Sequence, residues 1–223
     1  DPVERTDGTI VKGTVGDAVF GAIVDATVGA ASRADWRDDV RRAAETAAGR
    51  SKAGVILMGL SMGGLLSLEL TIEGLAPVRG VAAFASPLSL GRLAQAAGDL
   101  AAKSTLIGGL HWPKIGGPDI QNKAALPGPE AIPLSAVGEL NALIDTVRSG
   151  LHDVHVPLLV IQSRHDHTAP PWSAWEIFKL AGASWKRLVI LKRGFHVITR
   201  DVTSAQVAEE ALAFAERVSR NKA

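Results

Sequence analysis

The sequence predicts an α/β protein built on a mostly parallel sheet with flanking helices. Two short, almost wholly apolar runs at 54–58 and 81–85 enclose a helix-forming stretch at 62–72, and strands buried on both faces of a parallel sheet have this composition. Strand, helix and strand in that order form a βαβ unit. The same alternation returns from residue 157 onward. With 223 residues, of which 47% are apolar and 21% charged, the chain suits a single globular domain.

The overall composition excludes several classes of function. The net charge is +1 and the basic residues do not gather into blocks, so nothing favours nucleic acid or an anionic membrane surface as a partner. The chain has no cysteine, which removes disulfides, thiol nucleophiles and thiolate metal sites. It has neither a membrane-spanning apolar run nor a signal-like start. We expect no stable membrane insertion, a cytoplasmic location, and either a monomer or a homodimer.

The first third of the chain predicts strands followed by a helix. Residues 9–15 and 19–28 are rich in valine, isoleucine and threonine, which predicts two short strands or a hairpin, although a helix over 17–28 fits nearly as well. From Ala34 to Ala48 apolar residues recur every three or four positions, which predicts an amphipathic helix. Ser32 or Asp35 suits its start and Gly49 its end. Its expected inward residues are Trp36, Val40, Ala43, Ala44 and Ala47.

Between residues 86 and 154 the strand rhythm disappears. Two helical stretches at 88–102 and 133–151 flank a segment rich in glycine and proline at 108–129. A structureless loop of this length is unusual in a compact domain, so we expect a helical cap over about 87–154, inserted into one domain that spans 1–223. Beyond it, 157–162 and 187–191 predict strands, and 172–180 and 205–220 predict helices. The expected inward residues of the last helix are Val207, Ala211, Leu212, Phe214 and Val218.

The turn between the first buried strand and its helix carries the pentapeptide GLSMG at 59–63. A G-x-S-x-G turn needs small residues beside the serine because the backbone there is strained and crowded, and it exposes the serine hydroxyl at the end of the sheet. Ser61 is therefore a candidate nucleophile. The alternative is a glycine-rich turn without chemistry, such as a phosphate cradle.

A serine nucleophile needs an imidazole to take its proton and a carboxylate to orient that imidazole. In an open parallel sheet such groups collect at the carboxyl ends of the strands. Asp166 follows the strand that ends near Gln162, and His196 follows the strand that ends near Leu191. The chain order serine, aspartate, histidine is the order that the G-x-S-x-G elbow uses. The alternative for His196 is a histidine that is merely packed in the core.

The remaining histidines offer weaker candidates. His165 and His167 flank Asp166 and could ligate zinc, but no third histidine lies nearby in the sequence and no H-E-x-x-H pattern occurs. We therefore expect no metal and no organic cofactor. The other histidines are expected to be structural: His111, His152 and His155. Trp112 is a candidate lining residue of an acyl pocket, with core packing as the alternative.

These pieces together resemble the α/β-hydrolases, and among them the small bacterial carboxylesterases and monoacylglycerol lipases with a compact cap. The matching segments are GLSMGG at 59–64, VPLLVIQSRHDHTAPP at 156–171, GFHVITRD at 194–201, DWRDDVRRA at 35–43 and PLSAVGELNALIDTVRSGLHDV at 133–154. The resemblance runs from about Ala34 to the C-terminus. It implies Ser61 as nucleophile, Asp166 as acid and His196 as base. The backbone N–H of Met62 would then donate to the oxyanion.

The N-terminal region departs from this family pattern. The second oxyanion donor usually comes from a His-Gly-aromatic-x-Gly type segment after an early strand, and residues 1–33 contain no such segment. The fold also places four strands and a helix ahead of the helix that precedes the elbow, and these do not fit into 33 residues. The sequence therefore predicts N-terminal strands that are shortened or missing.

Two functions follow from these observations. The favoured one is a serine ester hydrolase that cleaves a small-molecule substrate, a short- to medium-chain carboxylic ester or a monoacylglycerol, through an acyl-enzyme. The alternative, motivated by the missing oxyanion segment, is a catalytically impaired hydrolase-fold protein that binds an apolar ligand or a protein partner. A thioesterase or amidase would use the same triad, and the sequence does not separate it from an esterase.

Overall fold

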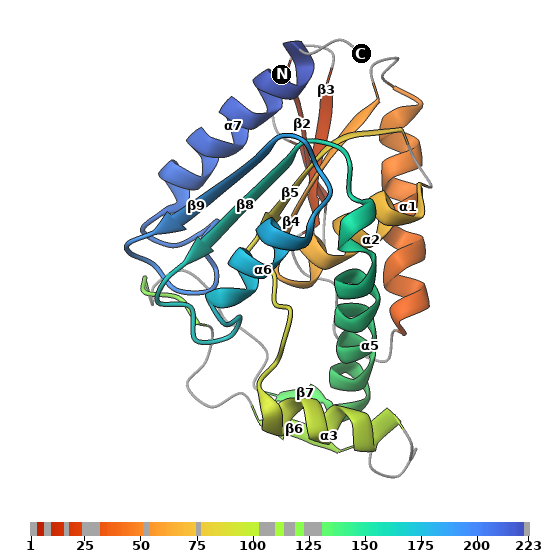
Figure 1. Ribbon diagram of the computed structural model, residues 1–223, viewed down its shortest axis with the longest axis vertical. Helices are drawn as coiled ribbons and strands as arrows, with labels where there is room; N and C mark the ends of the chain where they lie inside the picture. Colours follow the sequence, from red (N-terminus) through yellow and green to blue (C-terminus); the bar gives the residue numbers. More distant parts are fainter. Residues whose placement is uncertain are drawn as a thin grey trace.

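A seven-stranded sheet forms the centre of the protein in a computed structural model (Figure 1). The structure describes residues 4–6, 10–15, 18–23, 32–50, 54–74, 77–102, 110–113, 119–122 and 131–220. Its strands lie in the order β1-β2-β3-β4-β5-β8-β9. Their bounds are β1 Glu4–Thr6, β2 Ile10–Val15, β3 Ala18–Ile23, β4 Val55–Leu60, β5 Val78–Phe84, β8 Leu158–Ser163 and β9 Lys186–Leu191. A separate antiparallel pair joins β6 (His111–Pro113) to β7 (Ala131–Pro133).

The sheet is parallel from β3 to β9, which confirms the fold class expected from the sequence. β1 and β2 extend it at one edge as antiparallel strands. β4 lies between β3 and β5, and its carboxyl end carries the serine turn. Ile23, the last residue of β3, is in register with Gly59, so the chain leaves β3 beside that turn.

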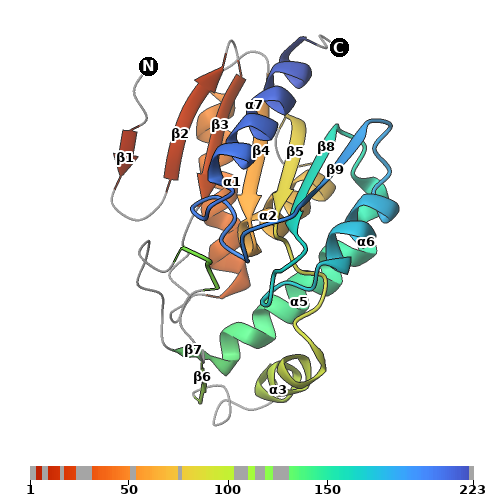
Figure 2. The ribbon, with the colours of Figure 1, turned by 90° about the vertical axis from the view of Figure 1, so that its left-hand side faces the viewer.

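The helices cover the two faces of the sheet unequally (Figure 2). One face packs against α1 (Arg33–Ala48), α2 (Met62–Glu73), α5 (Leu134–Gly150) and α6 (Trp172–Leu180), and the other against α7 (Ser204–Arg220). Side chains alternate between the faces along each strand. On β4, Leu57 joins the core beneath α1 and α2, whereas Ile56 and Met58 join the core beneath α7.

The two amphipathic helices expected from periodicity form close to their expected bounds. Ser32 caps α1 and exchanges hydrogen bonds with Asp35 in a capping box, and Gly49 is the C-cap. The buried residues of α1 are Trp36, Val40 and Ala44, and those of α7 are Val207, Phe214, Ala215 and Val218. The inward placement of Leu212 was wrong, because this side chain is 46% exposed. Successive residues of a helix are about 100° apart, and Leu212 is turned by that angle from the partly buried Ala211, away from the buried row.

At the N-terminus the structure takes the hairpin, not the helix, of the two readings that the sequence left open. β2 and β3 pair over their whole lengths from Ile10↔Ile23 to Val15↔Ala18. A hairpin needs only a short connection, whereas a parallel crossover needs a dozen residues or more. The sequence predicts N-terminal strands that are shortened or missing. The structure has the antiparallel strands β2 and β3 ahead of α1, preceded by the short β1. Residues 24–31 lie outside the described residues.

The segment between β5 and β8, expected as a cap, contains α3 (Arg92–Ala102), the β6–β7 pair, α5 and the short 3₁₀ helix η1 (Leu151–Asp153). α3 begins four residues later than expected, because Gly91 adopts a left-handed conformation with φ of 79° just before it. α3 and α5 cross where Gly98 meets Gly138, and a Cβ on Gly138 would lie 2.8 Å from the Gly98 carbonyl oxygen. Further along α5, Leu143 and Val147 belong to the core beneath the sheet.

Candidate active site

The turn after β4 holds Ser61 in a strained backbone conformation. Ser61 has φ of 54° and ψ of −120°, a conformation that residues with a Cβ rarely adopt. Its N–H donates to the carbonyl oxygen of Phe84 on β5 over 2.7 Å, which fixes the turn to the neighbouring strand. Ser61 is also the N-cap of α2. The serine therefore stands at the junction of a buried strand and a buried helix, where its side chain is partly exposed.

Two glycines of the motif are required by close contacts. A Cβ on Gly59 would lie 2.2 Å from the carbonyl carbon and oxygen of Gly63, so the strand end and the helix start approach each other without room for a side chain. A Cβ on Gly64 would lie 2.0 Å from the hydroxyl oxygen of Ser86. Sterics in this turn thus favour glycine at positions 59 and 64 of GLSMGG.

The structure brings the three candidate residues together at the carboxyl ends of β4, β8 and β9. Nε2 of His196 lies 3.0 Å from Oγ of Ser61, and Nδ1 of His196 lies 2.9 Å from Oδ2 of Asp166. The side chain of Asp166 is fully buried and that of His196 is 10% exposed. An ionised carboxylate only accepts hydrogen bonds, so Nδ1 carries the proton and Nε2 of the neutral ring is left to accept from the serine hydroxyl.

Four donors surround the carboxylate of Asp166. Oδ1 accepts from the N–H groups of Thr168 and Ala169 over 2.9 and 2.7 Å, and Oδ2 accepts from His196 and from Nε2 of Gln162, the latter over 2.7 Å. Burying a charge is unfavourable unless it is hydrogen-bonded. These donors satisfy that requirement and hold the carboxylate at a fixed orientation toward the imidazole.

The loop that carries His196 is anchored by a second buried aspartate, Asp201. Its carboxylate accepts from four backbone N–H groups, those of Gln121, Asn122, Phe195 and Val202. Burial alone would raise the pKa of Asp201, but these four donors outweigh it and lower the pKa below its ordinary value. Gly194 turns the loop with φ of 76°, and the hydroxyl of Ser163 donates to its carbonyl oxygen. His196 is thereby fixed from both sides of the loop.

The oxyanion hole is described in part. Met62 is the first residue of α2, and N–H groups in the first turn of a helix have no partner within that helix. Its N–H therefore remains a candidate donor, next to the serine as the sequence indicated. The second donor is expected from the residues after β3, and 24–31 lie outside the described residues.

Comparison with known proteins decides the family. Residues 20–203 match the family described as "Serine aminopeptidase, S33". The chain belongs to this family. It is 28% identical to a thermostable monoacylglycerol lipase of Bacillus sp. over 168 residues, which cover 72% of this chain and 62% of that protein. It is 24% identical to a carboxylesterase of Bacillus subtilis over 82% of this chain and 72% of that one. This chain thus spans less than two thirds of the lipase.

A solved structure shares the fold of this chain. A structure from work on LipS and LipT, two metagenome-derived lipolytic enzymes, superposes with a TM-score of 0.77 at 26% identity, over 85% of this chain and 76% of that one. The α/β-hydrolase fold that the motifs indicated is confirmed.

The other candidate residues have no place in the triad. His165 and His167 are exposed, and within the described residues no group of three or more histidine, aspartate or glutamate side chains could hold a metal ion. His152 and His155 are exposed as well. The side chains of His111 and Trp112 lie outside the described part of the chain.

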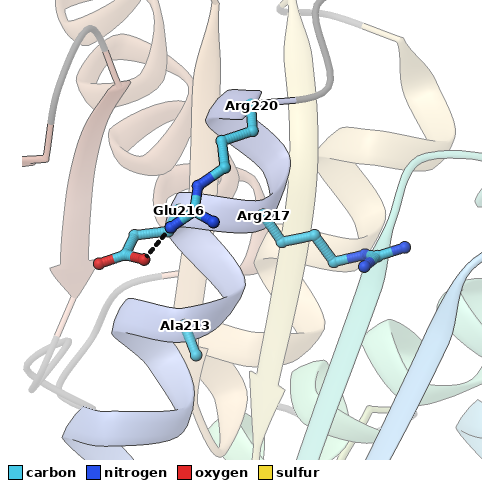
Figure 3. A pocket seen from close by; sticks show the side chains of 4 residues that line it. All are labelled: Ala213, Glu216, Arg217 and Arg220. Carbon is cyan, nitrogen blue, oxygen red and sulfur yellow. Dashed lines mark hydrogen bonds and ion pairs between the residues drawn. The ribbon is translucent and has the colours of Figure 1, made fainter.

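One further surface feature lies away from the triad. A shallow depression on the outer face of α7 is lined by Ala213, Glu216, Arg217 and Arg220 (Figure 3). It sits on the last turns of α7, toward the opposite end of the sheet from the strand ends that carry the triad (Figure 1). None of the described helices is long and apolar enough to cross a membrane.

Sequence reasoning missed the residues that support the triad. Gln162 was identified only as a strand end. A buried amide four residues before Asp166 needs a hydrogen-bond partner, and the carboxylate is one within reach. Asp119 and Asp201 also contact the loops that carry Asp166 and His196. Asp201 ends the quoted segment GFHVITRD, whereas Asp119 lies in a glycine- and proline-rich stretch without any recognisable pattern.

Proposed function

We propose that this chain is a serine ester hydrolase in which Ser61 is the nucleophile, His196 the general base and Asp166 the acid that orients it. The observation that carries the proposal is the continuous chain of hydrogen bonds from Ser61 Oγ through His196 to Asp166. A serine hydroxyl is a poor nucleophile at its own pKa and needs an adjacent base. The three residues meet that requirement at the carboxyl ends of β4, β8 and β9.

The reaction proceeds in two halves. Ser61 Oγ attacks the ester carbonyl while Nε2 of His196 takes its proton, and Asp166 stabilises the imidazolium that forms. The Met62 N–H donates to the developing oxyanion. His196 then returns the proton to the departing alkoxide, which leaves an acyl group on Ser61. Water, activated by the same imidazole, hydrolyses the acyl-enzyme and restores the serine.

We propose short- to medium-chain carboxylic esters and monoacylglycerols as substrates. The support comes from the names of two relatives, a monoacylglycerol lipase and a carboxylesterase. The family description, serine aminopeptidase, makes an amino-acid amide the appropriate competing substrate. A panel of p-nitrophenyl esters of increasing acyl length, a monoacylglycerol and an amino-acid p-nitroanilide separates these classes by kcat/KM.

The deciding experiment compares wild type with Ser61→Ala and with the matched control Ser135→Ala, which alters an exposed serine on α5. We expect Ser61→Ala to lower kcat by about 10⁴-fold or more and Ser135→Ala to leave it unchanged. A fluorophosphonate should label wild type and Ser135→Ala but not Ser61→Ala. Equal rates of ester hydrolysis in all three proteins would contradict the proposal. Wild type that neither turns over an ester nor labels at Ser61 would favour a ligand-binding role.

A further inference from the structure

A four-residue stretch between β6 and β7 contacts both loops that carry the acid and the base. Residues 119–122 lie about 45 positions before the acid loop and about 75 before the histidine loop along the chain, yet Asp119 is bonded to both. Its backbone carbonyl oxygen accepts from the N–H groups of His196 and Val197 over 3.0 and 3.1 Å. This bond acts directly on the main chain of the base.

The side chain of Asp119 holds the acid loop. One carboxylate oxygen accepts from the N–H of His167 over 2.9 Å and from the hydroxyl of Thr168 over 3.2 Å, and the other lies 2.8 Å from Nδ1 of His167. His167 and Thr168 directly follow Asp166. The Asp119 side chain is only 13% exposed, whereas His167 is 65% exposed, so these bonds tie a largely buried carboxylate to a loop at the surface.

The rest of the stretch prevents Asp119 from moving independently. Ile120 is 2% exposed, and the N–H groups of Gln121 and Asn122 donate to the buried carboxylate of Asp201. The side chain of Gln121 accepts from the N–H of Gly194. The stretch is therefore a fixed element against which both loops are held.

We propose that Asp119 is a positioning residue that sets the separation of the loops carrying Asp166 and His196. Its backbone carbonyl holds the histidine loop, and its carboxylate holds the acid loop. The 2.9 Å contact between His196 Nδ1 and Asp166 depends on that separation. Misplacement of catalytic groups by about 1 Å lowers turnover by as much as about 10²-fold. Only the kinetic tests of this inference rest on the proposed function.

The first test removes the carboxylate and keeps the carbonyl. In Asp119→Ala we expect kcat for a p-nitrophenyl ester to fall about 10- to 100-fold while KM stays within about threefold. Fluorophosphonate labelling of Ser61 should slow in parallel. The matched control is Asp153→Ala, because Asp153 is an exposed aspartate paired with the neighbouring His152, and its kcat should equal that of wild type. Thermal denaturation establishes the folded fraction of each variant.

The second test separates positioning from general support of the fold. Asp119 acts on the acid loop partly through His167, whose side chain is 65% exposed and whose removal leaves the core intact. We expect His167→Ala to lower kcat about three- to tenfold and the double variant to fall no further than Asp119→Ala, since partners in one network are not additive. If the losses in kcat of the two single variants multiplied in the double variant, the proposal would be contradicted. If Asp119→Ala does not fold, Asp119→Asn takes its place in the cycle.

The third readout does not depend on catalysis. The proton between His196 Nδ1 and Asp166 gives an NMR resonance that can be identified by its loss in Asp166→Asn. We expect it to shift or broaden in Asp119→Ala and to stay unchanged in Asp153→Ala. An unchanged resonance, or a wild-type kcat, in folded Asp119→Ala would overturn the inference. If wild type neither hydrolyses esters nor labels at Ser61, the proposed function fails, and this resonance still decides the role of Asp119.

Discussion

The proposed nucleophile and its two partners are held in place by different physical means. Ser61 is fixed by the backbone of its own turn, where φ is 54° and a Cβ on Gly59 would collide with the main chain of Gly63. Asp166 and His196 are fixed by hydrogen bonds that reach them from several loops. The serine side of the site depends on close packing, and the acid–base side on polar contacts.

The difference matters for how each side tolerates change. Close packing of backbone against backbone leaves no flexible group to move aside, so a single added methyl group is disruptive. A hydrogen-bonded loop has several anchors, and the loss of one leaves the others in place. We therefore expect substitutions at the serine turn to destroy the fold locally, and those at the acid and histidine loops to reduce stability or rate in steps.

The largest effect is expected for Gly59→Ala. The added Cβ would lie 2.2 Å from the carbonyl carbon and oxygen of Gly63 and 2.4 Å from the nitrogen of Gly64. Because these are backbone atoms, β4 and α2 must move apart. We expect a loss of about 3 kcal/mol or more in the free energy of unfolding, measured by urea denaturation, together with loss of fluorophosphonate labelling at Ser61.

The matched control for this prediction is Gly49→Ala at the end of α1. There φ is −63° and the nearest atoms to an added Cβ lie 3.6 Å away. The free energy of unfolding should change by less than about 1 kcal/mol. If Gly59→Ala were as stable as this control and still labelled at Ser61, packing would not be what holds the serine, and the contrast between the two sides of the site would disappear.

The same contrast explains how much of the site the sequence could predict. The steric demands of the turn fall on neighbouring residues, so the segment GLSMGG displays them and Ser61 could be identified directly. Asp166 and His196 were identified from their places after strands, because the carboxyl ends of parallel strands meet at one edge. In the structure His196 lies between the other two side chains and contacts both Asp166 and Ser61.

There is a physical reason why the supporting network could not be predicted from the sequence. Asp119 acts on His196 through a backbone carbonyl, which every residue possesses, so its identity leaves no pattern in the sequence. The N-terminal hairpin was left open against a helix because 17–28 combines valine, isoleucine and threonine, which favour strands, with three alanines, which favour helices, and pairing with β4 decides between them. Leu212 was misplaced because a 3.6-residue period assigns edge positions of an amphipathic face poorly.

On the polar side, Asp201→Asn should have an intermediate effect. An amide retains one acceptor oxygen and replaces the other with a donor, so two of the four N–H groups that Asp201 accepts lose their partner. We expect the free energy of unfolding at pH 7 to fall by about 2 kcal/mol. Activity measured well below the unfolding midpoint should fall less than tenfold, because the other contacts of the histidine loop remain.

The pH dependence of this effect has a defined sign. The folded pKa of Asp201 lies below its ordinary value of 3.8, so its contribution to stability is present above pH 3.8 and is lost as the pH falls toward the folded pKa. The stability difference between wild type and Asp201→Asn should be largest near neutral pH and shrink below about pH 3.8. Asp145→Asn, at an exposed position on α5, should show no such difference, and a constant gap at all pH values would exclude this role for Asp201.

The smallest effect on the free energy of unfolding is expected for Gln162→Met, which removes one donor from Asp166 and keeps the volume of the side chain. Nε2 of Gln162 donates to Asp166 over 2.7 Å, while its Oε1 has no hydrogen-bond partner among the described residues. The substitution therefore deletes a useful bond together with an unsatisfied buried oxygen. The free energy of unfolding should change by less than about 1 kcal/mol, while kcat falls about tenfold because the carboxylate is held less firmly in its orientation toward the imidazole.

Gln206→Met, on the exposed face of α7, is the control for this substitution and should change neither quantity. A folded Gln162→Met that is about tenfold slower at unchanged KM would show that polar contacts on the acid side can be removed singly, with a loss in rate and none in structure. A parallel loss of stability and rate would instead mean that Gln162 packs the end of β8 as tightly as Gly59 packs the end of β4. In that case both sides of the site would depend on close packing.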